Sequence, residues 1–113
     1  MKPFPHTAAL PQDLKDALLV GRVWRSGPNA GPCVVAVRGG QVFDITRHAP
    51  TMAELLDRPD CLALARTAVG EPLGDAVALV AQALTGTDGP LHLLAPCDLQ
   101  AIKACGVTFA VSL

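Results

Sequence analysis

The stretch that decides the fold is CVVAVRGGQVFDI, residues 33–45. Two β-prone runs flank Gly39 and Gly40, and glycine readily takes the positive φ angles that a tight two-residue turn demands. The pattern predicts an antiparallel β-hairpin whose turn lies at these two glycines, with φ positive at both. A hairpin alone is only marginally stable in water, so the rest of the chain must pack against it.

The returning arm of the hairpin alternates between two sides. Phe43 and Ile45 fall on one side, and Val42 and Asp44 fall on the other. We expect Phe43 and Ile45 to face the core and Asp44 to face water.

The residues before the hairpin predict an irregular arm, a strand and a loop. Residues 1–17 mix prolines with charged side chains and predict an irregular N-terminal arm. Residues 19–25, LVGRVWR, alternate well enough for a strand that places Val23 and Trp24 on opposite faces. Residues 26–32, SGPNAGP, predict a loop because two prolines and two glycines disfavour both helix and strand pairing.

Two short helices are predicted after the hairpin. Thr51 is placed as the N-cap of the first helix, with Glu54 three residues later as its capping-box partner. Pro59 ends this helix, and Asp60 is placed to cap the second one.

The last part of the chain predicts one more helix and further extended runs. Residues 70–74, GEPLG, predict a break before a helix over residues 75–84, whose apolar side chains recur at helical spacing. Residues 91–94 predict a short strand, and residues 98–104 a single helical turn. Residues 106–113 form an apolar, β-prone run.

Together these elements predict one α+β domain over residues 18–113. Its core is a small, mainly antiparallel sheet with a central β-hairpin, and two or three short helices cover one face. The apolar run that ends at Leu113 leads us to expect a fragment, the N-terminal domain of a longer enzyme that lacks its catalytic domain. We expect residues after about Gly106 to be disordered, or ordered by a second copy in a homodimer.

Composition disfavours several classes of partner. The net charge is −1 and the basic residues are scattered singly, which disfavours nucleic acid. Apolar residues make up 50% of the chain, but no stretch approaches the roughly 20 uninterrupted apolar residues of a membrane span. The N-terminus lacks the apolar core of a signal peptide, so we expect a cytoplasmic protein.

The thiols and imidazoles predict no metal site. The cysteines are Cys33, Cys61, Cys97 and Cys105, and the histidines are His6, His48 and His92. There is no C-x-x-C pair and the histidines stand alone, so four reduced thiols packed as small apolar groups are favoured over a zinc site. A thiol enzyme that uses Cys105 or Cys97 is a third, weaker functional hypothesis.

Other candidate chemistry has a simpler structural interpretation. The only two glutamates, Glu54 and Glu71, provide no general acid and base pair once the first serves as a cap. Trp24 with Arg22 and Arg25 could bind a planar ligand, but an aromatic residue on a half-buried strand is the commoner case. No catalytic, cofactor-binding or metal-binding residue is therefore assigned from these patterns.

Three segments resemble the N-terminal region of the fumarylacetoacetate hydrolase family. They are residues 19–24, residues 34–46 and above all residues 93–113, LLAPCDLQAIKACGVTFAVSL. The resemblance is nearest to the branch of bacterial sugar-acid enzymes typified by 2-keto-3-deoxyarabonate dehydratase. It implies a small N-terminal α/β domain before a larger, β-rich catalytic domain that holds a divalent metal, usually magnesium.

The same resemblance transfers no site residue to this chain. The family's metal ligands include a Glu-x-Glu pair, and this sequence has none. Gly106 matches the family's pattern, but Thr108 and Phe109 replace an asparagine and a tyrosine, and Ser112 stands about where a histidine would be.

The sequence therefore predicts a non-catalytic N-terminal domain of an enzyme that acts on 2-keto or β-diketo acids. Its partners would be its own C-terminal catalytic domain and, in a homodimer, a second copy, and the 113-residue chain alone would be inactive. The alternative, from a different class, is a self-standing small interaction module without catalytic activity.

Overall fold

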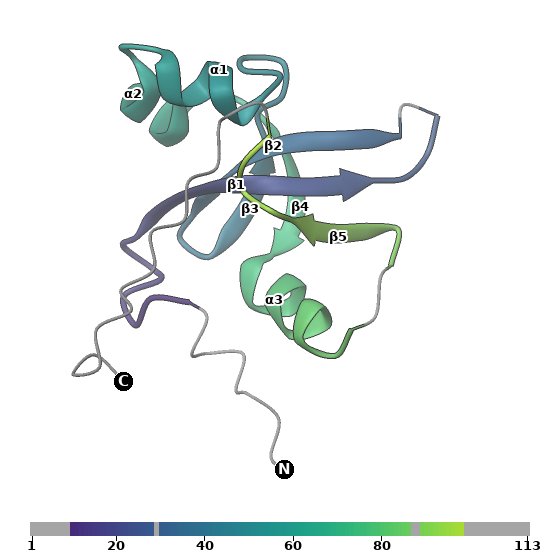
Figure 1. The fold of residues 1–113 in the computed structure, drawn as a ribbon. Helices are drawn as coiled ribbons and strands as arrows, with labels where there is room; N and C mark the ends of the chain where they lie inside the picture. The colour runs from purple at the N-terminus through teal and green to yellow at the C-terminus, as the bar shows by residue number, and fades with distance from the viewer. Residues whose placement is uncertain (1–9, 29, 87–88, 99–113) are drawn as a thin grey trace, which may run out of the picture.

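The predicted hairpin lies at the centre of the fold. The computed structural model describes residues 10–28, 30–86 and 89–98, and Figure 1 shows their arrangement. Within these ranges the elements, in chain order, are β1 Leu18–Arg25, β2 Gly31–Arg38, β3 Gln41–Asp44, α1 Met52–Asp57, α2 Cys61–Thr67, β4 Glu71–Asp75, α3 Ala76–Leu84 and β5 Leu91–Leu94. The strands form an antiparallel sheet in the order β4-β3-β2-β1-β5, so the class is α+β.

The hairpin turn is as predicted. Gly39 and Gly40 have φ values of 57° and 81°, and β2 pairs with β3 directly across them, Arg38 opposite Gln41. The Gly40 carbonyl also accepts a hydrogen bond from the Ala76 amide at 2.8 Å. The turn therefore holds the first residue of α3 against the sheet.

β1 is the longest partner of the hairpin. All of its residues pair with β2, from Leu18 opposite Arg38 to Arg25 opposite Gly31. On its other side only the last half of β1 pairs with β5. The predicted strands before the hairpin and at residues 91–94 are confirmed.

β4 corrects the prediction of a simple break at residues 70–74. Residues Glu71–Asp75 form an edge strand antiparallel to β3, with an irregular register between Val42 and Phe43. An edge strand tolerates Pro72 because its missing N–H need not pair with a second neighbour. Gly70 precedes it where a Cβ would lie 2.2 Å from the Asp44 carbonyl oxygen, so the chain passes there only as glycine.

The N-cap predicted for α1 is confirmed, whereas the prediction that the Asp60 side chain caps α2 is wrong. The Thr51 hydroxyl accepts a hydrogen bond from the Glu54 amide at 3.1 Å, which caps α1. α2 starts after Asp60, but the Asp60 carboxylate makes no capping bond. It binds the Arg58 guanidinium instead, at 2.8 Å and 3.0 Å, because the two side chains lie on either side of Pro59.

Arg38, at the end of β2, closes the C-terminal end of α2. Its guanidinium donates to the carbonyl oxygens of Ala65 at 2.6 Å and Ala68 at 2.8 Å, and more weakly to that of Leu64 at 3.3 Å. It also lies 5.2 Å from the ring centre of Phe43. The last carbonyl groups of a helix lack hydrogen-bond donors within the helix and carry partial negative charge. The Arg38 guanidinium supplies both the missing donors and a compensating positive charge.

Two helices, α1 and α2, cover one face of the sheet, which fits the prediction of two or three helices there, but α3 covers the opposite face, which was not predicted. One core cluster joins β2 to α1 and α2, and the other joins β1, β2 and β3 to α3; Figure 1 shows α1 and α2 on one side of the strands and α3 on the other. The first cluster contains Val34, Ala36, Ile45, Ala49, Met52, Leu55 and Ala68, and the second contains Val23, Val35, Val42, Ala76 and Leu79. The apolar run from Cys33 to Val37 reflects this, since a strand buried on both faces shows no alternation.

This double coverage also corrects the expectation for the returning arm. Ile45 is buried as predicted, but Phe43 is only half-buried, and Val42 on the opposite side is buried against α3. The Asp44 side chain is 12% exposed and lies in an ion pair rather than in water.

Several predictions fall outside the described residues. These concern the first nine residues of the N-terminal arm, the helical turn after Asp98 and the run over residues 106–113, with His6, Cys105 and the proposed homodimer contact. Residues 13–17 form a hydrogen-bonded turn, in which Asp13 accepts from the amides of Asp16 and Ala17, in keeping with an arm without helix or strand.

Candidate functional site

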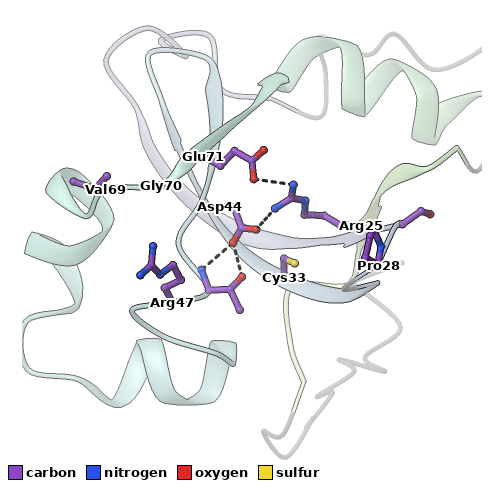
Figure 2. A pocket seen from close by; sticks show the side chains of 10 residues that line it. Arg25, Pro28, Cys33, Asp44, Arg47, Val69, Gly70 and Glu71 are labelled. Atoms are coloured by element: carbon purple, nitrogen blue, oxygen red, sulfur yellow. Dashed lines mark hydrogen bonds and ion pairs between the residues drawn. The ribbon is translucent and has the colours of Figure 1, made fainter.

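A cavity lies where β1 and β3 end and β2 and β4 begin. It measures about 590 Å³, within the range of small-molecule sites, and Figure 2 shows the side chains around it. Its lining residues are Arg25, Ser26, Pro28, Cys33, Asp44, Thr46, Arg47, Val69, Gly70 and Glu71.

An arginine that joins two acids occupies one part of this cavity. Arg25, the last residue of β1, donates to the Asp44 carboxylate at 2.7 Å and to the Glu71 carboxylate at 2.8 Å. The hydrogen bonds to Asp44 and then to Glu71 raise the pKa of Arg25. Because β2 separates β1 from β3, the arginine reaches across the sheet and ties β1 to both β3 and β4.

Asp44 is held as a carboxylate by further donors. The Thr46 amide and hydroxyl donate to it at 2.9 Å and 2.5 Å. Burial raises the pKa of Asp44, but the hydrogen bonds from Thr46 and Arg25 outweigh it, so the pKa lies below its usual value. Asp44 is therefore ionised at neutral pH, and its acceptor sites are used within the protein.

The thiol in the cavity is kept protonated. Burial raises the pKa of Cys33, and the nearby Asp44 carboxylate acts in the same direction. The Cys33 thiol donates a long hydrogen bond to the Gly31 carbonyl oxygen, at 3.8 Å. A protonated thiol is a poor nucleophile, so Cys33 acts here as packing.

A second cluster ties the segment after β5 to α1. Asp98 accepts from the first two amides of α1, those of Met52 at 2.7 Å and Ala53 at 3.1 Å. Arg22 lies 3.7 Å from the same carboxylate and donates to the carbonyl oxygens of Ala95 and Cys97. This cluster fixes residues 95–98 against the helix and β1.

The other residues weighed from the sequence do not gather into a site. His48 contacts the Val69 carbonyl oxygen at 2.9 Å, and His92 stacks on Trp24 with ring centres 6.5 Å apart. Arg22 lies with Trp24 on one face of β1, whereas Arg25 turns to the other face, so the three do not form a planar-ligand site. Among the described cysteines, Cys33, Cys61 and Cys97 are free thiols.

The cluster of Arg25, Asp44 and Glu71 was not predicted from the sequence. One local signal was available, since an aspartate two residues before a threonine at a strand end often accepts from the following backbone. The Arg25–Asp44 pair spans 19 positions of the chain and the Arg25–Glu71 pair spans 46. Both pairs therefore depend on the order of the strands in the sheet.

In the part of the chain that the structure describes, no three His, Cys, Asp or Glu side chains are placed to hold a metal ion, and no helix is long and apolar enough to cross a bilayer. No protein-family model, no curated protein and no solved structure matches the chain.

Proposed function

We propose that this chain is the non-catalytic N-terminal domain of an enzyme of the fumarylacetoacetate hydrolase family. The whole enzyme would be a cytoplasmic hydrolase or dehydratase that needs a divalent metal, such as magnesium, and acts on 2-keto or β-diketo acids. Its cation would bind the keto and carboxylate oxygens of the substrate in the catalytic domain and stabilise the enolate that forms as a C–C or C–O bond breaks.

One observation carries the non-catalytic role. The least exposed charged groups of this cavity, Arg25 and Asp44, pair with each other, and Arg25 also pairs with Glu71. A general acid or base must be able to exchange its proton with a substrate, and a carboxylate held by three donors is poorly suited to that task. The cluster instead fastens three strands together, as a scaffold domain requires.

The second cluster supports a domain that orients the next part of the chain. Asp98 and Arg22 fix residues 95–98, which lie within the segment of strongest resemblance, against α1. A chain that leaves a domain from a fixed point can set the orientation of the part that it leads to. The catalytic domain would be that part, and a second copy of the chain would be a further partner.

Exposed apolar side chains give such a domain something to pack with. Leu56 and Leu62, on α1 and α2, are 54% and 58% exposed. In the proposed enzyme these residues contact the catalytic domain. They equally favour the alternative, a self-standing interaction module whose partner is another protein.

Two measurements test the proposal. The isolated chain, incubated with Mg²⁺ and either an acylpyruvate or a 2-keto-3-deoxy sugar acid, is expected to give no loss of substrate. Turnover that a chelator abolishes would refute the non-catalytic role.

The reading frame beyond the codon of Leu113 separates the two functions. A continuing frame that encodes a Glu-x-Glu pair supports the enzyme domain. A stop codon directly after Leu113 supports the interaction module and contradicts the enzyme domain.

A further inference from the structure

One cation in the cavity lined by Arg25 and Asp44 has no counter-ion among the described residues. Arg25 is neutralised by Asp44 and Glu71, but the Arg47 side chain, which lines the same cavity, makes no hydrogen bond or ion pair with any other described residue. Arg47 follows β3 directly after Thr46, and it is exposed. Among the described residues the cavity thus offers an unpaired guanidinium, whose planar fork suits a carboxylate.

An uncovered apolar side chain lies in the same cavity wall. Val69 is 84% exposed, the highest fraction among the large apolar residues described. Its position is fixed, because its carbonyl oxygen contacts His48 and the next residue, Gly70, is pressed against the Asp44 backbone. Figure 2 shows Arg47 and Val69 on the side of the cavity away from Arg25.

From these features we infer that the cavity binds a small carboxylate with a short apolar chain. The carboxylate pairs with Arg47, and the apolar chain covers Val69, which lies on the same side of the cavity. The volume of about 590 Å³ admits such a molecule without moving the Arg25 cluster. This inference does not rest on the proposed function, since it concerns a cavity in this domain and no catalytic step.

The charges of the cavity favour an anion over a cation at this position. Both carboxylates already face Arg25, and Asp44 is further bound by Thr46, so a cationic ligand would compete with those bonds. A carboxylate at Arg47 breaks no existing interaction and gains a charge-assisted hydrogen bond.

The test is an NMR titration of the ¹⁵N-labelled chain with sodium hexanoate. Binding is expected to shift the amide signals of Thr46, Val69 and Gly70. Sodium acetate, which lacks the apolar chain, is expected to bind more weakly, and hexylamine, which has the opposite charge, to leave these signals in place.

Two arginine variants separate the site from general charge effects. Arg47→Gln is expected to weaken hexanoate binding about five- to tenfold, as expected for loss of one charged hydrogen-bond partner. Arg66→Gln is the matched control, because Arg66 is also exposed and unpaired among the described residues but lies on α2 outside the cavity. Both side chains are exposed, so the folded spectrum should be retained.

A third variant tests the apolar wall. Val69→Ser is expected to weaken hexanoate binding and to leave acetate binding unchanged. The inference is overturned if Arg47→Gln binds hexanoate as tightly as the unchanged chain, if Arg66→Gln loses as much, or if hexylamine shifts the same signals.

Discussion

Replacing Arg38 with methionine isolates the bond between the central strand and α2. Methionine keeps an unbranched apolar side chain but removes the guanidinium that binds the carbonyl oxygens of Ala65, Ala68 and Leu64. α2 has seven residues, and so short a helix is not stable without such tertiary contacts. The change should therefore lower the stability of the whole domain and not only of the helix end.

The size of the effect can be estimated from these contacts. A hydrogen bond to a charged group contributes about 1.5–3 kcal/mol, and the Phe43 ring contact adds about 0.5–1 kcal/mol. One guanidinium shared among three part-buried carbonyls gives less than the sum, because the three hydrogen bonds share a single charge. We expect the free energy of unfolding to fall by about 2–3 kcal/mol.

Urea denaturation followed by circular dichroism measures this loss. With an m-value of about 1–2 kcal/mol/M, the midpoint should fall by about 1–3 M. The control is Arg66→Met, which removes an exposed charge from the last turn of the same helix and should cost less than about 0.5 kcal/mol. Equal losses in the two variants would refute the assignment of Arg38 as the closing residue of α2.

Three further predictions concern the hairpin and the cavity. The pKa of Asp44 is lower in the folded protein than its unfolded value of about 3.9, so its contribution to stability is present above that pH and is lost as the pH falls through the folded value. The variant Asp44→Asn should therefore lose less stability on acidification than the unchanged chain, as measured by urea titrations at several pH values. An unchanged pH profile would contradict this prediction. Gly40→Val places a β-branched residue at a φ of 81° and should lower stability by about 1 kcal/mol or more in the same assay, whereas an unchanged midpoint would count against the positive-φ turn. Gly70→Ala puts a methyl group 2.2 Å from the Asp44 carbonyl oxygen and should disrupt the pairing of β3 with β4, which faster amide hydrogen exchange in β4 would reveal. The control is Gly21→Ala, which should change the exchange rates little because open space surrounds its added methyl group.

The features predicted correctly depend on neighbours in the chain. Gly39 and Gly40 predict their turn because the turn needs φ angles that other residues resist, and Thr51 predicts the start of α1 because its hydroxyl reaches an amide three residues on. Each of these interactions closes within a few residues, so the tertiary structure has little freedom to override it.

The features that were missed depend on which strands lie side by side. β4 contains Pro72 and Gly74 and follows Gly70, so it looks like a break, yet it pairs because β3 offers it a free edge. The same strand order brings Glu71 next to Asp44 and within reach of Arg25. No local sequence pattern predicts that Glu71, Asp44 and Arg25 come into contact.

The sequence by itself determined the α+β class, the central hairpin, and the helix starts at Thr51 and Asp60. Only the tertiary structure decided that helices cover both faces, that Asp44 is an ion-paired carboxylate, and that Arg47 is left without a partner among the described residues beside Val69. The physical reason is range: backbone dihedrals and caps act over three or four residues, whereas burial and charge pairing depend on surfaces assembled from residues far apart in the chain.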